Sequence, residues 1–342
     1  MSAAPALDDR VDAWLTRHVG LAAPLRATLI AGGRSNLTYR VEDADGRTVV
    51  LRRPPTSHVL PTAHDMAREY RIIAALGPQG VPVPAALALC TDSAVAERPF
   101  YVMEFVDGLV LRDREQAERA LAPEIRASVG DHLAETLAAL HDVDVDRAGL
   151  GDLARREGYV ERQIHRWLGQ YEQMRESQGT DGVIDVGRRL AAAIPPAQRT
   201  TVVHGDYRLD NTVLSPAGTV RAILDWEICT LGDPLADVGL LLDYWAEPGD
   251  DVTVLLGAAP TTAPGFATRA EVLASYASRS PLDLGAIAFY QAFGFWKLAC
   301  ILQGVHARYA AGAAAGDRTG VDQFATNVRR LGERALAEVE AL

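Results

Sequence analysis

The sequence has few cysteines, no excess of positive charge and no zinc-binding pattern. Its three cysteines, Cys90, Cys229 and Cys300, lie far apart, which argues against a disulfide framework and favours a reducing compartment. Because no CxxC pair or histidine-rich spacing occurs, we expect no structural zinc. The net charge of −11 argues against a nucleic-acid partner, because such partners select basic surfaces.

The sequence also has no apolar run that would suit a membrane span or a secretory signal. Its most apolar stretch, residues 287–302, is short and is interrupted by Gln291 and Lys297, so we expect a buried helix there. The N-terminus has no basic start followed by an apolar core. We therefore predict a soluble cytoplasmic protein with no membrane partner, whose 342 residues suffice for two lobes.

The most informative segment covers residues 200–227. An apolar run ends at His204, and a polar loop then carries Asp206 and, five residues later, Asn211. After a turn, a second apolar run stops at Asp225. Strands at the two apolar runs would bring the oxygen-bearing side chains of Asp206, Asn211 and Asp225 to one edge of a small sheet.

These three side chains suit phosphoryl transfer. The spacing from Asp206 to Asn211 equals that between the base Asp and the metal Asn of a kinase catalytic loop, and Asp225 follows as the metal-binding Asp does. Asp206 would accept the proton of the acceptor hydroxyl, and Asn211 and Asp225 would ligate Mg²⁺. The alternative is a polar hairpin turn with Asp225 as a cap, which does not explain the full ordered set.

Three motifs mark this part of the chain: HGDYRLDN at 204–211, LDWE at 224–227 and GDPLAD at 232–237. Together they resemble the aminoglycoside phosphotransferase family of kinase-like enzymes. Within that family the nearest resemblance is to the branch found beside, or fused to, acyl-CoA dehydrogenases. The resemblance extends to four further segments: 32–39, 50–55, 100–104 and 303–309.

The resemblance implies the fold class α+β, in the form of a bilobal protein-kinase-like fold. A small N-terminal nucleotide-binding lobe with an antiparallel sheet would occupy residues 1–106. A larger, mainly helical C-terminal lobe, residues 107–342, would hold the catalytic and acceptor-binding groups. The cofactors that the resemblance implies are ATP and Mg²⁺.

A glycine-rich turn at residues 31–36 lies between two predicted strands. Gly33 would let the backbone approach phosphate, and Ser35 and Asn36 can donate hydrogen bonds to phosphate oxygens. Taken alone, this pattern favours an ordinary glycine-rich hairpin. With the downstream motifs, we assign the turn to the phosphates of ATP.

Arg52 departs from the kinase pattern. A kinase-like fold places a lysine on this third strand, where it reaches the α- and β-phosphates and pairs with a helix glutamate. Arginine keeps the charge and can bind phosphate through two hydrogen bonds, and the resembling branch has it at this position. Glu69, on the helix predicted over 65–76, is the expected partner, although alone it would be assigned to a solvated surface. Arg53 should face the other side of the strand.

Residues 104–108 would form the hinge between the lobes. Glu104 and Val106 would offer backbone groups to the adenine edge of ATP. Because backbone contacts leave no strict side-chain pattern, this assignment rests on chain order and on the resemblance.

Four charged residues are assigned to the acceptor. Arg208 and Glu227 lie within the catalytic motifs. Arg162 and Arg166 lie one turn apart on a predicted helix beside a core tryptophan, and they form either a solvated basic face or an anchor for an anionic group such as a CoA phosphate. Asp237, on the helix that follows, is expected to hold the catalytic loop in place rather than touch substrate.

The combined prediction is MgATP-dependent transfer of the γ-phosphate to a hydroxyl of a small molecule. The resembling branch implies a hydroxyacyl-CoA or related hydroxy acid as the acceptor, with an acyl-CoA dehydrogenase as a partner. Three alternatives remain open: an aminoglycoside or other cationic acceptor, a nucleotide-binding regulator with little catalysis, and a scaffold that docks an acyl-CoA dehydrogenase. The short segment between Asp225 and Gly232 argues against a protein acceptor, because it has no room for a long activation loop.

Overall fold

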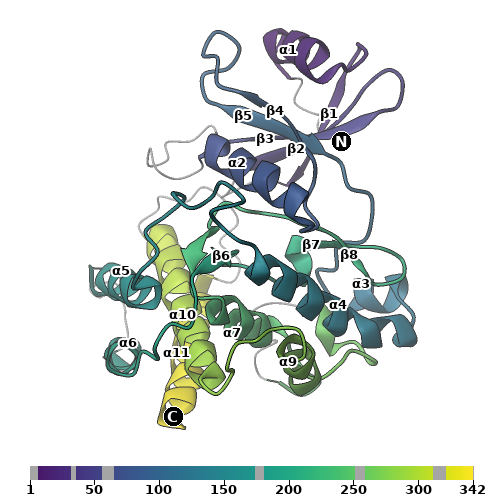
Figure 1. The fold of residues 1–342 in the computed structure, drawn as a ribbon. Coiled ribbons are helices and arrows are strands. Elements are labelled where there is room, and N and C mark those ends of the chain that lie inside the picture. Colours follow the sequence, from purple (N-terminus) through teal and green to yellow (C-terminus); the bar gives the residue numbers. More distant parts are fainter. Residues whose placement is uncertain are drawn as a thin grey trace. The chain divides into compact units, whose positions relative to one another are not determined.

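The structure is a computed structural model that describes residues 7–31, 36–55, 65–173, 181–250, 259–310 and 321–341 (Figure 1). The chain divides into two compact units. Unit 1 comprises Met1–Gly108, Ala148–Leu150 and Arg221–Glu227, and unit 2 comprises Leu109–Arg147, Gly151–Val220 and Ile228–Leu342. Asp225 therefore belongs to unit 1, and Asp206 and Asn211 belong to unit 2.

Unit 1 contains a five-stranded antiparallel sheet in the order β1-β2-β3-β5-β4 (Figure 1). The strands are β1 Arg26–Ala31, β2 Leu37–Glu42, β3 Thr48–Arg53, β4 Ala86–Cys90 and β5 Phe100–Glu104. A tight turn joins β2 to β3, where Gly46 has a φ of +83° and Asp43 Oδ1 accepts the N–H groups of Asp45 and Arg47. Short polar side chains and a left-handed glycine are the residues that such a turn requires.

The two faces of this sheet carry different side chains, because successive residues of a strand point to opposite faces. On one face, buried apolar side chains of the strands pack against helix α1, Asp9–Val19. On the other face, Arg52 and Tyr101 contact Glu69 of helix α2, Met66–Leu76. Arg52 and Tyr101 therefore lie on the face of the sheet that α2 covers. Figure 1 shows α2 beside this sheet.

Unit 2 is mainly helical. Its helices are α3 Arg114–Ala120, α4 Pro123–Asp142, α5 Tyr159–Gln173, α6 Asp181–Ala192, α7 Leu235–Tyr244, α9 Arg269–Ala277, α10 Ile287–Ala310 and α11 Val321–Glu340. The short strands are β6 Thr201–Val203, β7 Thr212–Leu214 and β9 Thr230–Gly232, and β8, Val220–Ile223, leads into unit 1. Strands β6 and β9 pair antiparallel, and unit 2 also contains the 3-10 turns η3 Leu209–Asn211 and η4 Pro260–Thr262. A further 3-10 turn, η1 Gly77–Gln79, lies in unit 1.

Helix α10 lies in the core of unit 2. Its residues Phe295, Trp296 and Ala299 are almost fully buried, as expected for a helix that is apolar around most of its circumference. It packs against α7 and α11. The buried helix predicted at 287–302 is therefore present and continues to Ala310. Among the described residues, no helix is both long enough and apolar enough to cross a membrane.

Helices α7 and α10 approach each other closely at Gly239. A Cβ at this position would lie 2.7 Å from the carbonyl oxygen of Tyr290, a backbone atom that cannot rotate away. We predict that Gly239→Ala lowers the free energy of unfolding by about 1–3 kcal/mol through overpacking. On α5, a Cβ at Gly169 would meet nothing within 4 Å, so Gly169→Ala should raise the free energy of unfolding by about 0.5–1 kcal/mol. Urea denaturation measures both, and equal effects would contradict the close approach.

Candidate active site

The segment that follows β6 turns sharply at one glycine. Strand β6 ends at Val203, and Gly205 has a φ of +85°, in the left-handed region that favours glycine. A Cβ at Gly205 would also lie 3.2 Å from the side chain of Ile228. The chain therefore requires glycine between His204 and Asp206.

A buried carboxylate holds this turn in place. Asp237, at the start of α7, accepts the backbone N–H groups of His204 at 2.6 Å and of Gly205 at 2.8 Å. Its Oδ2 also lies 3.4 Å from Nε2 of His141, whose other ring nitrogen contacts the hydroxyl of Tyr276 at 2.8 Å. Burial opposes the charge of Asp237, but its interactions with His141, His204 and the N–H of Gly205 together outweigh burial and lower its pKa below the ordinary value.

The Asp206 side chain is oriented by its neighbours in unit 2. Asn211 donates from Nδ2 to the Oδ2 of Asp206 at 2.8 Å and to its backbone carbonyl at 2.9 Å. Arg208 Nε lies 3.3 Å from the same Oδ2 and 3.0 Å from Asp210 Oδ1. The guanidinium of Arg208 stacks over the ring of Tyr244, 4.7 Å from its centroid. Because Nδ2 of Asn211 is committed to Asp206, its Oδ1 is the atom that can ligate a cation.

In unit 1, the buried guanidinium of Arg52 lies close to three carboxylates. The Nε of Arg52 pairs with Glu69 Oε2 at 3.0 Å, and its Nη2 pairs with Asp225 Oδ1 at 2.5 Å. The same Nη2 lies 3.7 Å from Glu227 Oε2. The hydroxyl of Tyr101 adds a hydrogen bond of 3.1 Å to Glu69. Arg52 and Glu69, far apart in sequence, are therefore direct partners.

Burial and the nearby charges shift the pKa values of both Arg52 and Glu69. Burial works against the charge of Arg52, but Glu69, Tyr101 and Asp225 outweigh it and raise the Arg52 pKa. Burial also raises the pKa of Glu69 to about 7, because the favourable effect of Arg52 is offset by the charges of Asp225 and Glu227. One arginine therefore does not neutralise all three carboxylates.

Two further features of unit 1 bear on Asp225. Its φ of +63° is strained for a residue with a side chain, and such strain collects at functional sites. The next residue, Trp226, is buried and donates from Nε1 to the carbonyl of Ile223 at 3.1 Å, which anchors the strained turn. Asn36 donates from Nδ2 to Glu69 at 2.7 Å and to Glu227 at 3.3 Å. Glu227, which the sequence analysis assigned to the acceptor, thus contacts groups assigned to ATP.

The other residues assigned to ATP are placed differently. Gly33 and Ser35 lie outside the described residues. Glu104 is exposed, and its Oε2 accepts the N–H of Ala85 at 3.2 Å. Val106 is half-buried. The structure therefore groups Asn36 with the charged network of unit 1, and it gives Glu104 a separate contact.

The two arginines predicted as a basic pair, Arg162 and Arg166, both lie on α5 and make separate contacts. Arg162 is half-buried and donates to the carbonyl of Arg155 at 2.7 Å. Arg166 is exposed, with its guanidinium 5.5 Å from the ring centroid of Trp167. Trp167 is half-buried rather than a core residue, and its indole donates to Gln163 at 3.1 Å.

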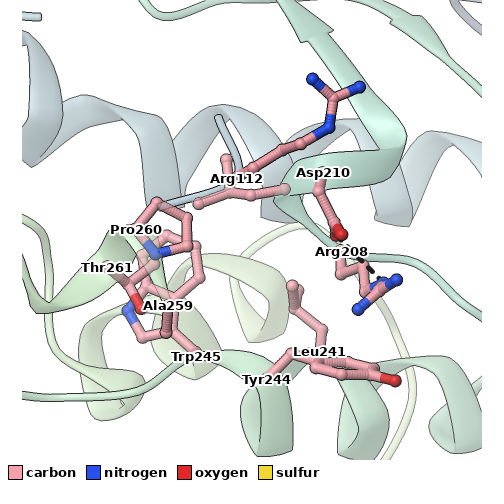
Figure 2. Close-up of a pocket in the computed structure, with 10 residues that line it drawn as sticks. Arg112, Arg208, Asp210, Leu241, Tyr244, Trp245, Ala259, Pro260 and Thr261 are labelled. Atoms are coloured by element: carbon pink, nitrogen blue, oxygen red, sulfur yellow. Dashed lines mark ion pairs between the residues drawn. The ribbon is translucent and has the colours of Figure 1, made fainter. Parts of the chain in front are cut away.

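A pocket of about 70 Å³ lies beside the catalytic loop in unit 2 (Figure 2). Apolar side chains from the C-terminal half of α7 and from the segment around η4 form much of its lining. Arg112, Arg208 and Asp210 supply its charged groups, and the dashed line in Figure 2 marks the ion pair between Arg208 and Asp210. Arg208 also lies 3.3 Å from Asp206 Oδ2, so this residue connects the pocket lining to the Asp206 carboxylate.

The residues assigned to a metal fit Mg²⁺ in chemical type. Asn211 and Asp225 offer hard oxygen donors, which Mg²⁺ prefers, and the side chain of Asp225 is 33% exposed. Among the described residues, no group of three or more His, Cys, Asp and Glu side chains could enclose a metal ion. Mg²⁺ commonly keeps several waters and substrate phosphates as ligands, so it does not require a dedicated cage of protein side chains.

The sequence analysis missed four residues near these groups: Tyr101, Tyr244, Arg112 and Lys297. Tyr101 and Tyr244 reach their partners through contacts that are distant in sequence, and no local pattern marks them. Lys297 donates from Nζ to the carbonyl of Gly205 at 3.2 Å. Its position inside an apolar run was a signal that could have identified it.

Comparison with known proteins gives a consistent result. Residues 26–276 match the model described as "Phosphotransferase enzyme family". Acyl-CoA dehydrogenase family member 10 of Mus musculus is 36% identical over 296 residues, covering 85% of this chain and 27% of that protein. Acyl-CoA dehydrogenase family member 11 of Rattus norvegicus is 33% identical over 337 residues, covering 95% and 42%. This chain therefore spans less than half the length of these two curated relatives.

A solved structure extends the similarity to three dimensions. A protein from Ralstonia eutropha JMP134, provisionally named an aminoglycoside phosphotransferase, is 34% identical with a TM-score of 0.82, covering 98% of this chain and 99% of that one. These findings confirm the predicted α+β, protein-kinase-like fold and the resemblance to the aminoglycoside phosphotransferase family.

The Arg52 network generates a stability prediction. Arg52→Met leaves three carboxylates without their cation, so we expect the free energy of unfolding to fall by about 3–5 kcal/mol. Arg52→Lys keeps the charge but cannot present two separate nitrogens to Glu69 and Asp225, so we expect a smaller loss. Chemical denaturation without added Mg²⁺ or nucleotide measures both.

The neighbouring Arg53 provides the control. It lies on the opposite face of β3, where it lines a pocket with Leu7 and Val11. Arg53→Met should change the free energy of unfolding by no more than about 1 kcal/mol. An equal loss for Arg52→Met and Arg53→Met would contradict the special role of the Arg52 network.

Proposed function

Because the chain belongs to the phosphotransferase enzyme family, we propose that it uses MgATP to phosphorylate a hydroxyacyl-CoA or a related hydroxy acid. The enzyme is an ATP-dependent phosphotransferase that acts on hydroxyl groups. The observation that carries the choice of acceptor is the charge of the pocket beside Asp206. Of the lining residues that the structure describes, Arg112 and Arg208 are basic and Asp210, which pairs with Arg208, is the one carboxylate.

We assign the proton-accepting role to Asp206. Its Oδ2 is engaged by Asn211 and Arg208, and these contacts fix the direction of the carboxylate. The side chain remains 27% exposed, so an acceptor hydroxyl can reach it. A fixed carboxylate can accept the hydroxyl proton and align the attacking oxygen, which supplies much of the catalysis in phosphoryl transfer.

Asn211 and Asp225 would hold the Mg²⁺ that accompanies ATP. When bound, the ion neutralises negative charge on the phosphates. Arg52, which stays protonated, would contribute a second positive charge to the nucleotide. Glu69 and Tyr101 keep its guanidinium in one orientation, and Asn36 adds a hydrogen bond to Glu69.

The charge of the pocket weighs against a polycationic acceptor. An aminoglycoside would need several carboxylates, whereas among the described residues the pocket lining supplies one, Asp210, beside two arginines. Its apolar lining suits a short carbon chain, and Arg112 suits a carboxylate, phosphate or thioester oxygen. The names of the relatives, acyl-CoA dehydrogenase family members 10 and 11, support the same acceptor class.

A second candidate function is a nucleotide-binding regulator with little catalysis. The observation in its favour is that Arg52 is paired with three carboxylates. At this position a kinase-like fold uses a lysine to bind phosphate. An acyl-CoA dehydrogenase is the proposed partner under either function, because the longer relatives carry that name.

The first test is ATP consumption with Mg²⁺ against hydroxyacyl-CoAs, hydroxy acids and aminoglycosides. We expect turnover with a member of the first two classes, and a fall of at least about 100-fold in Asp206→Asn with ATP binding retained. Turnover with aminoglycosides alone would contradict the proposed acceptor. ATP binding with no acceptor-dependent turnover above that of Asp206→Asn would favour the regulator.

The second test concerns Arg112. Because a hydrogen bond to a charged group contributes about 1.5–3 kcal/mol, Arg112→Ala should raise the KM for an anionic acceptor by roughly 10- to 100-fold and leave the KM for ATP unchanged. Arg114→Ala is the matched control, since Arg114 is exposed and pairs with Glu118. If both variants have the same acceptor KM, the pocket in Figure 2 is not the acceptor site.

A further inference from the structure

The chain contains 34 lysine and arginine residues, and Lys297 is the one lysine among them. Lys297 lies on α10 and is 8% exposed, although lysine is almost never buried without a partner. Arginine is larger and planar, whereas the lysine ammonium is a compact charge with three donors. Lys297 therefore places a compact charge at a buried position of α10.

The ammonium of Lys297 contacts the catalytic loop directly. Its Nζ donates to the carbonyl of Gly205 at 3.2 Å, and this carbonyl belongs to the peptide that joins Gly205 to Asp206. Asp237 holds the preceding peptide through the N–H of Gly205. The two peptides that flank Gly205 are therefore fixed by opposite charges. Because glycine has more backbone freedom than other residues, both contacts restrict the segment that carries Asp206.

The charged groups that act on Lys297 come from three elements. Burial lowers the pKa of Lys297 below its ordinary value of 10.5. Asp206 on the catalytic loop and Asp237 on α7 act in the opposite direction, because negative charges favour the ammonium form. Arg166 on α5 adds to the lowering. The positive charge of Lys297 is therefore coupled to the carboxylate of Asp206.

We propose that Lys297 is a positioning residue for Asp206, which pins the peptide between Gly205 and Asp206 and places a positive charge beside the carboxylate. This inference rests on the proposed function in one respect, namely that Asp206 is the proton acceptor. A residue that only fills the core would have no coupling to Asp206 and no effect on turnover beyond its effect on folding.

The single lysine allows a direct measurement of the coupling. Protein made with [ε-¹³C]lysine has one lysine side-chain signal, whose pH titration without added Mg²⁺ gives the pKa of Lys297. We expect a midpoint below 10.5, a lower midpoint in Asp206→Asn and a higher midpoint in Arg166→Gln. An unchanged midpoint in folded Asp206→Asn would overturn the proposal. This readout requires no acceptor, so it stands even if the proposed function fails.

Kinetics then tests the positioning role. Because a misplaced catalytic group costs up to about 100-fold, Lys297→Met should lower kcat by roughly 10- to 100-fold with the KM for ATP changed less than about twofold. Lys297→Arg should recover part of kcat, since it restores the charge but not the compact shape.

The control is Gln303→Met, which removes another buried polar side chain from α10. It should change thermal stability without changing kcat. Wild-type kcat in Lys297→Met would overturn the proposal. So would an equal loss of kcat in Lys297→Met and Gln303→Met at equal loss of stability.

Discussion

The catalytic loop depends on one buried carboxylate. Asp237 accepts two consecutive backbone N–H groups, of His204 and Gly205, and so fixes the left-handed turn that presents Asp206. A backbone N–H group that stays unpaired in a protein interior costs free energy. Asp237 avoids this cost for the two N–H groups that follow the end of β6. His141, His204 and the N–H of Gly205 lower the pKa of Asp237 despite its burial. The position of Asp206 is thus decided by groups that do not themselves react.

Unit 1 uses charge in a different way. There, a single buried arginine, Arg52, is shared by Glu69, Asp225 and Glu227. Burial, together with the nearby charges of Asp225 and Glu227, raises the pKa of Glu69 to about 7. One arginine does not neutralise three carboxylates. Residues that bind a cation and a cation-bound nucleotide are expected to carry such an excess of negative charge before the cation binds. The strained φ of Asp225 agrees with this, because strain persists where function requires it.

Much of the fold and part of the site could be predicted from the sequence. Hydrophobic periodicity and turn residues indicated strands of unit 1 and helices such as α2 and α10, since these signals are local. The motifs indicated Asp206, Asn211 and Asp225 by their order. The contact of Lys297 with Gly205 could not be predicted, because it joins residues 92 positions apart through helix packing. The grouping of Glu227 with Asn36 also depends on packing of distant segments.

The most direct test of this account is a structure of the protein with Mg²⁺ and a non-hydrolysable ATP analogue. The account predicts that the ion is ligated by Asn211 and Asp225, and that the terminal phosphate lies within reach of an acceptor hydroxyl held by Asp206. In that state, Arg52 should contact the phosphates as well as Glu69. A nucleotide bound away from these residues, or an ion held without Asn211 and Asp225, would contradict the assignment of the active site.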